Sequence, residues 1–200
     1  MTKLFILLFC TIAATCTIAQ TPGALTPGAP IPMAETKMKS TTGKFVSIED
    51  VIRKNGVLVV FSCNTCPYVK KYQGRTLEMI KEATGNDIGV IIINSNEELR
   101  NSDDSYLAMQ QYANQQGYKN AEYVVDTKSA LADAFNANRT PECFLFDNKR
   151  KLVYHGAIDD NPDAAGMKRK HLSVAINELV TGKEVTIKET RSVGCMIKRS

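Results

Sequence analysis

Two cysteines separated by two residues are the part of this sequence whose spacing could do chemistry. Cys63 and Cys66 follow directly after the apolar run of residues 57–61, and a segment with helical spacing of apolar residues comes next. Unpaired backbone N–H groups at the start of a helix favour an anion, and a thiolate is the anion available here. Such a position can lower a cysteine pKa from about 8.5 to between about 3.5 and 7.5. The pattern therefore predicts a pair of thiols that exchanges disulfides through a thiolate nucleophile.

Structural or metal-binding roles for Cys63 and Cys66 are less well supported by the residues around them. A structural disulfide would close a loop too short to restrain the unfolded chain much. A zinc site would need a second pair of ligands, and haem attachment would need a histidine in place of Pro67. A copper-binding or copper-delivery module stays open as an alternative, with His155 as the third ligand.

Length and composition indicate one ordinary globular domain with a leader. The chain has 200 residues, 44% of them hydrophobic, and a formal net charge of +4, with acids interspersed among most of the lysines. Because there is no basic stripe, we expect no nucleic-acid partner. Once the leader is removed, four cysteines remain, which is too few for a disulfide scaffold.

The first 19 residues have the features of a signal peptide. Lys3 gives a positive start, an uncharged apolar stretch follows, and the small residue Ala19 precedes Gln20. The stretch is short compared with the roughly 20 residues of a bilayer span. We therefore expect an exported protein, periplasmic or otherwise extracytoplasmic, in a compartment where disulfides persist. An uncleaved anchor, or a lipid attached to Cys16, would be its only means of membrane attachment.

Residues 20–35 are predicted to be a linker rich in proline and glycine. Its prolines lack N–H donors and fix φ, so the segment is not expected in a helix or at the centre of a sheet. It is either a tether that spaces the domain from a membrane or wall, or simply a disordered N-terminus. The folded domain is accordingly expected over residues 36–200.

Apolar runs of strand length alternate with helical segments along this domain. Apart from a short strand and helix before the cysteines, the sequence predicts strands over 57–61, 89–94, 122–126, 143–146 and 151–156, and helices from residue 63 or 66 to 85 and over 102–116, 129–137 and 163–179. The alternation predicts an α/β fold with a parallel sheet flanked by helices, and the last two strands form an antiparallel hairpin at one edge. The tail from residue 183 is expected to be irregular.

Five motifs in this order resemble the thioredoxin fold, and more closely the exported redoxins of the AhpC/TSA superfamily. The resemblance covers roughly residues 36–200, and its motifs lie at residues 61–69, 93–96, 140–147, 152–160 and 193–198. It implies a thioredoxin-like fold with a central mixed sheet flanked by helices. A lone pair of cysteines would be weak support, whereas five motifs in the right order are specific.

The resemblance also implies roles for individual residues. In such proteins Cys63 would be the exposed nucleophile, and Cys66, one helical turn deeper, would resolve the mixed disulfide. Thr140 and Pro141 would form the cis-proline loop, in which the backbone of Thr140 pairs with an extended substrate segment. The implied activity is that of a thiol–disulfide oxidoreductase acting on protein disulfides. No metal or organic cofactor is implied, and an envelope electron donor or acceptor is the expected partner.

Some features depart from that resemblance or are left unexplained by it. Thioredoxins commonly hold a buried acid on the strand before the cysteines, and residues 57–61 contain none. Peroxiredoxins carry a threonine three residues before the reactive cysteine, and if Cys66 is aligned there that place is taken by Cys63. A thiol-dependent peroxidase is therefore the weaker alternative. Cys143 is predicted to be a small core residue, and Cys195 has no assigned role. The direction of exchange stays open, and the resemblance favours a reductase.

Overall fold

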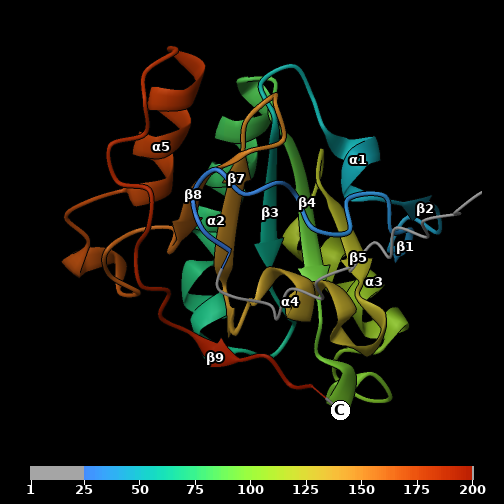
Figure 1. Cartoon of the computed structure of the whole chain (residues 1–200). Coiled ribbons are helices and arrows are strands. Elements are labelled where there is room, and N and C mark those ends of the chain that lie inside the picture. Colours follow the sequence, from blue (N-terminus) through green and yellow to red (C-terminus); the bar gives the residue numbers. More distant parts are fainter. Residues whose placement is uncertain (1–24, 200) are drawn as a thin grey trace, which may run out of the picture.

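A computed structural model describes residues 25–199 and shows one seven-stranded sheet with helices on both faces (Figure 1). The strand order is β2-β1-β5-β4-β3-β7-β8, in which β3, β4 and β5 run parallel and the outer strands are antiparallel. The strands of this sheet are β1 (Met38–Ser40), β2 (Phe45–Val46), β3 (Val57–Phe61), β4 (Gly89–Asn94), β5 (Glu122–Val125), β7 (Glu142–Phe146) and β8 (Leu152–Gly156). A separate two-stranded pair joins β6 (Arg139–Thr140) to β9 (Cys195–Met196).

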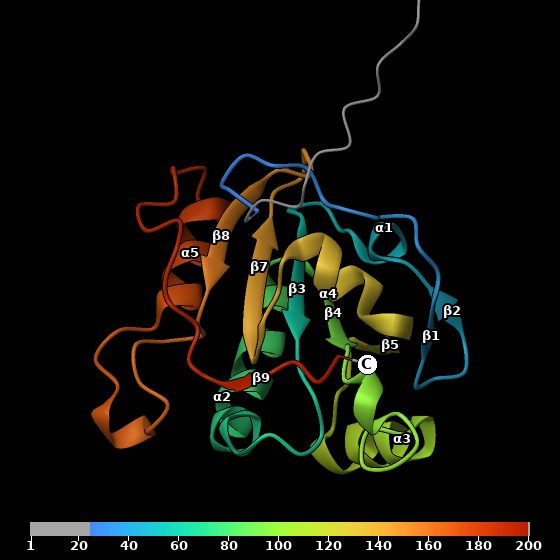
Figure 2. The same cartoon turned by 60° about the horizontal axis from the view of Figure 1, so that its bottom comes forward.

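The central strand β3 is buried from end to end because helices cover both faces of the sheet. Its side chains alternate between two hydrophobic cores, with Leu58 and Val60 in one and Val57, Val59 and Phe61 in the other. The first core is covered by α2 (Pro67–Gly85), α3 (Tyr106–Gln116) and α5 (His171–Val180), and the second by α1 (Ile48–Val51) and α4 (Ala130–Phe135). This arrangement fixes the carboxyl end of β3, which is seen from another side in Figure 2.

The helix ends follow the local chemistry of the sequence. Ser105 caps α3 by accepting a hydrogen bond from the N–H of Ala108, and Gly117 ends it in the left-handed conformation. The helix begins a turn later than the predicted start at residue 102. The described residues also contain three short 3-10 helices: η1 (Glu97–Leu99), η2 (Thr127–Ser129) and η3 (Ala164–Gly166).

The predicted helix over residues 163–179 is wrong in its first half. The chain forms η3 and a loop there, and α5 begins only at His171. Competing polar contacts account for the loop: the Arg75 guanidinium pairs with the Asp159 carboxylate and donates to the carbonyl of Asn161. The Asp160 carboxylate in turn accepts from the N–H of Lys168. These contacts bind the backbone in a non-helical course.

The predicted linker is also wrong within the described residues, because residues 25–35 pack against the domain. The N–H of Gly28 donates to the carbonyl of Leu152, and the N–H of Leu152 donates to the carbonyl of Ala29. Ile31 joins the core and is only 8% exposed. The prolines do not prevent this packing, because the hydrogen bonds are donated by the N–H groups of Gly28 and Leu152, which are not prolines. The predicted signal peptide, residues 1–19, and residues 20–24 lie outside the described residues.

The chain from residue 183 is irregular, as predicted, except for a short strand in the C-terminal tail, meaning here residues 194–199. Its strand β9 lies beside the start of α2, at the carboxyl end of β3 (Figure 2, red). A two-residue strand has no apolar run of its own, so periodicity gave no signal for it. Within the part of the chain that the structure describes, no helix is long and apolar enough to cross a membrane.

Candidate thiol redox site

The two predicted cysteines lie at the carboxyl end of β3, where α2 begins. Cys66 is the N-cap residue of α2 and Pro67 is its first helical residue, a place where a missing N–H costs nothing. The last residue of β3, Phe61, is paired with Ile93 of β4 on one side and with Glu142 of β7 on the other. The site is therefore bounded by the loops that follow β4 and precede β7.

The predicted exposure of Cys63 is wrong. Its side chain and that of Cys66 are both buried, at 2% and 3% exposed, and they pack with Val69 in a small apolar cluster. The Sγ atom of Cys63 lies 3.5 Å from the hydroxyl oxygen of Thr140. Cys63 precedes the helix and faces inward, whereas Cys66, expected a turn deeper, stands at the helix start.

The neighbours of the two thiols favour a thiolate on Cys66. A hydrogen bond from the Cys63 thiol, opposed by burial, is the largest influence that lowers the pKa of Cys66 to about 4. The thiol of Cys195 and the backbone N–H groups of Val69 and Cys195 act in the same direction. The same bond between the two cysteines, together with burial, raises the pKa of Cys63. These influences shift the pKa of Cys66 downward and that of Cys63 upward.

The peptide bond between Thr140 and Pro141 is cis, as the family resemblance predicted. The carbonyl oxygen of Thr140 lies 3.3 Å from Sγ of Cys66 and accepts the S–H of that residue when it is protonated. When Cys66 is ionised this carbonyl opposes its charge, but the surrounding donors outnumber it. Glu142 fixes the loop, because its carboxylate accepts from the N–H groups of Asn138 and Arg139.

The strand edge of Thr140, which the resemblance assigned to a substrate segment, is already paired. Thr140 is 1% exposed, and its partner in the antiparallel pair of β6 and β9 is Cys195. Cys195 also packs against the cluster of Cys63, Cys66 and Val69. The tail thus stands where an added strand would lie.

A buried carboxylate that sequence reasoning missed holds the segment between the cysteines. Asp104 is fully buried, and its carboxylate accepts from the backbone N–H of Asn64 at 2.9 Å and from the side-chain amides of Asn94 and Asn96, each at 2.8 Å. Its charge contributes to the raised pKa of Cys63. The sequence placed Asp104 only within the predicted helix over residues 102–116. An acid lies near the cysteines after all, but it comes from the loop just before α3.

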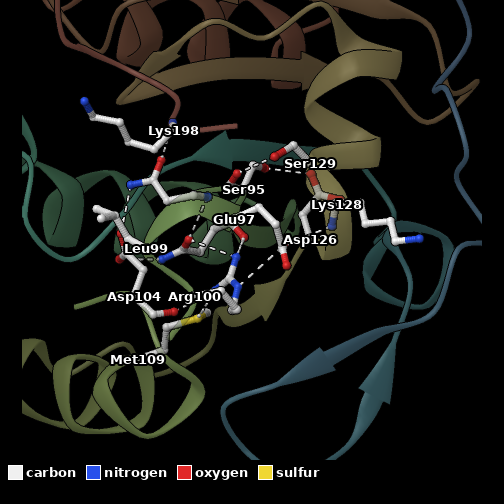
Figure 3. Close-up of polar contacts among 12 residues, drawn as sticks. Ser95, Glu97, Leu99, Arg100, Asp104, Met109, Asp126, Lys128, Ser129 and Lys198 are labelled. Carbon is white, nitrogen blue, oxygen red and sulfur yellow. Dashed lines mark hydrogen bonds and ion pairs between the residues drawn. The ribbon is translucent and has the colours of Figure 1, made fainter. Parts of the chain in front are cut away.

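Arg100 holds the backbone on which this carboxylate stands (Figure 3). Its guanidinium donates to the backbone carbonyls of Asp104 and Asn94, both at 2.8 Å, and lies 3.7 Å from the Glu97 carboxylate. Glu97 also accepts from the N–H of Lys128 at 3.0 Å. The loops around the site are therefore joined by one polar network.

Two other features lie apart from the thiols. His155, the predicted third copper ligand, is hydrogen-bonded to Glu142 at 2.7 Å and stacked on Phe144. Among residues 25–199, no three histidine, cysteine or acidic side chains are grouped to hold a metal ion, so that ligand set is not assembled. A cavity of about 570 Å³ lies near Asn55 and Asp147, at the amino end of β3 and thus away from the cysteines. Cys143 is fully buried in the core, as predicted.

Comparison with solved structures places this geometry in a known class, the proteins with a thioredoxin-like fold. An uncharacterised conserved protein from Geobacillus kaustophilus is 28% identical, with a TM-score of 0.81 over 88% of this chain and 93% of that one. A hypothetical protein from Sinorhizobium meliloti is 27% identical, with a TM-score of 0.80 over 89% and 97% of the two chains. The thioredoxin domain of a thiol–disulfide oxidoreductase from Bacteroides vulgatus, at 17% identity and a TM-score of 0.54 over 66% and 89%, shares the fold.

The chain belongs to the Redoxin family, whose sequence model matches residues 26–170. A search of curated proteins found no match. The match begins ten residues before the predicted domain start at residue 36, in agreement with the packing of the N-terminal segment. The family and the thioredoxin-like fold confirm the resemblance to redoxins and to the thioredoxin fold that the sequence motifs indicate.

Proposed function

We propose that this redoxin is a thiol–disulfide oxidoreductase that acts on protein disulfides through Cys63 and Cys66. The observation that supports the proposal most strongly is the environment of Cys66, which starts a helix and accepts a hydrogen bond from the thiol of Cys63. A thiolate beside a second thiol is the arrangement that disulfide exchange requires.

In this proposal the roles of the two cysteines are the reverse of those inferred from the sequence. The Cys66 thiolate attacks one sulfur of the substrate disulfide, which forms a mixed disulfide and expels the other sulfur as a thiolate that takes up a proton. Cys63 then loses its proton and attacks Sγ of Cys66, which releases the second substrate thiol. Two electrons pass to the substrate, and a Cys63–Cys66 disulfide remains.

We further propose that the protein works as a reductase and is reset by an electron donor in the cell envelope. This direction rests on the resemblance to exported redoxins. The reduction potentials of proteins with this fold span about −270 to −120 mV, and we expect that of the Cys63–Cys66 pair to be about −250 mV. Export rests on the leader at residues 1–19. It is tested by cell fractionation and by sequencing the N-terminus of the purified protein, which should begin at Gln20.

Reduction of insulin disulfides, with dithiothreitol as the electron donor, tests the activity. We expect the full mature protein to accelerate the reaction and Cys66→Ser to abolish the acceleration, while Cys63→Ser still reacts with insulin but turns over more slowly. Cys143→Ala is the matched control, because this thiol is buried in the core away from the site. Equal activity of Cys66→Ser and the unchanged protein would contradict the proposal.

A thiol-dependent peroxidase is the second candidate, and one observation favours it. The residue three positions before Cys66 is Cys63, whose thiol donates to the Cys66 sulfur much as a hydroxyl could. Consumption of hydrogen peroxide with dithiothreitol as the reductant separates the two functions. Peroxide turnover that is much faster than insulin reduction and is lost in Cys66→Ser would favour the peroxidase.

A further inference from the structure

The C-terminal tail is held against the cis-proline loop by contacts on both sides of Cys195. Before it, the carbonyl of Gly194 accepts from the Arg139 guanidinium at 3.0 Å. A Cβ atom on Gly194 would overlap the carbonyl oxygen of Thr140, so only glycine lets the backbone approach so closely. After it, the N–H of Ile197 donates to the carbonyl of Asn138 at 3.0 Å, and Ile197 is 5% exposed.

The end of the tail is tied to the same polar network that holds the segment between the cysteines. The N–H of Lys198 donates to the side-chain oxygen of Asn96 at 2.9 Å, and its carbonyl accepts from the N–H of Glu98 at 3.1 Å. Asn96 donates to the Asp104 carboxylate, which also accepts from the backbone N–H of Asn64. The tail and the Cys63–Cys66 segment are therefore positioned by one shared carboxylate.

These anchors bring a third thiol to Cys66. Cys195 lies opposite Thr140 in the β6–β9 pair, and both its thiol and its backbone N–H favour the Cys66 thiolate. It is half-buried, whereas Cys63 and Cys66 are almost wholly covered. Cys195 is thus the most accessible thiol of the cluster and borders Cys66 on the side of the strand edge.

We propose that Cys195 is a third redox thiol, which resolves the mixed disulfide formed on Cys66. This inference rests on the proposed function. After Cys66 has attacked the substrate disulfide, the Cys195 thiolate attacks Sγ of Cys66, which forms a Cys66–Cys195 disulfide. The second substrate sulfur leaves as a thiolate and takes the proton that Cys195 gave up. Cys63 can then attack Cys66 in turn, which yields the Cys63–Cys66 disulfide and restores the Cys195 thiol.

The position of β9 suits both steps of this reaction, because the strand can be displaced by a substrate and can then displace it in turn. An extended substrate must displace β9 to reach Thr140 and Cys66, because the tail already pairs with that edge. When β9 returns, it competes with the substrate backbone for the same edge and brings Cys195 back to Cys66. Burial and the charge on Cys66 raise the pKa of Cys195 to about 11. Once Cys66 is in a disulfide, it has no charge and that second influence disappears.

Disulfide mapping after treatment with glutathione disulfide tests this role in the full mature chain. Trypsin cuts the protein so that Cys63 and Cys66 share peptide 55–70, Cys195 lies in 192–198 and Cys143 lies in 140–149. In Cys63→Ser we expect a disulfide that links 55–70 to 192–198. In Cys63→Ser/Cys195→Ser we expect a stable glutathione adduct on 55–70, at least about tenfold more abundant than in Cys63→Ser, because an adjacent thiol outcompetes free glutathione.

The controls separate this inference from the proposed function. Cys63→Ser/Cys143→Ala should behave as Cys63→Ser, and circular dichroism should show each variant to be folded. Equal glutathione adducts with and without Cys195, and no link between 55–70 and 192–198, would overturn the role of Cys195 while leaving Cys66 reactive. If Cys66 takes up no glutathione in any variant, the proposed function and this inference both fail.

Discussion

The pKa values of Cys63 and Cys66 are shifted in opposite directions because the two thiols meet different neighbours, although only two residues separate them. Cys66 stands at the start of α2 and receives the Cys63 thiol, whereas Cys63 is buried near the charge of Asp104. The position of the two thiols, after a buried strand and at the start of a helix, could be predicted from their spacing and from the strand before them. Which of the two thiols has the lower pKa could not be predicted in the same way. It depends on which residue caps the helix and on Asp104, which lies 38 positions beyond Cys66 in the chain.

A thiolate titration tests the charge on Cys66. In the reduced protein we expect the ultraviolet absorbance of a thiolate at neutral pH, lost as the pH falls through about 4 and absent at neutral pH from Cys66→Ser. Because the pKa is depressed in the folded state, this group stabilises the fold most above its unfolded pKa, and the contribution is lost as the pH falls toward the folded value. Titration of the first thiolate near the ordinary value of about 8.5 would contradict the assignment.

Asp104 accepts three hydrogen bonds while fully buried, so replacing one of its oxygens with an amide must break at least one of them. We expect Asp104→Asn to lower the free energy of unfolding by about 2–4 kcal/mol, measured by chemical denaturation. Asp103→Asn is the matched control, because the side chain of Asp103, the neighbouring residue, is exposed. Equal stabilities of the two variants would show that the carboxylate does not hold this network.

At the scale of elements, the buried strands and the long helices were predictable because each contains its own apolar pattern. Residues 57–61 and 89–94 are unbroken apolar runs, and both form strands. The short strand β9 was not predictable from the sequence. The tail that contains it is held by partners far away in the sequence, such as Asn96 and Asn138. The loop before α5 was missed for the same reason, since Arg75 on α2 holds it.

The close approach of β9 to the cis-proline loop gives a prediction for Gly194. In Gly194→Ala the added methyl group must push the tail away from Thr140, so we expect Cys66 to react several-fold faster with iodoacetamide. The rate is measured by mass spectrometry of peptide 55–70 under native conditions. Gly74→Ala is the control, because a Cβ atom there meets no neighbour. Unchanged reactivity in Gly194→Ala would mean that the tail does not cover Cys66.

At the scale of the whole molecule, the order of the motifs was enough to predict the thioredoxin-like fold. What the order did not reveal is how the two ends of the described chain pack onto this fold. Residues 25–35 cover β8 and the second core, and residues 194–199 cover the redox site. Both segments lack a periodic apolar pattern, and their positions depend on surfaces that exist only once the sheet has formed. The domain is accordingly larger than its pattern indicated.

Ile31 tests whether the N-terminal segment belongs to the folded domain. Its side chain is 8% exposed and packs in the second core, so we expect Ile31→Ala to lower the free energy of unfolding by about 2 kcal/mol. Met33→Ala, at a position that is 44% exposed, should change it far less. Chemical denaturation of the two variants gives the comparison, and equal effects would return residues 25–35 to the role of a linker.

The redox state of Cys63 and Cys66 in mixtures of reduced and oxidised dithiothreitol or glutathione tests the central claim most directly. We expect one reversible two-electron transition at about −250 mV, abolished in Cys66→Ser and in Cys63→Ser/Cys195→Ser. A transition near about −120 mV would contradict the reductase direction, since such a pair makes disulfides. The absence of any reversible transition would contradict the claim that these two cysteines form a redox couple.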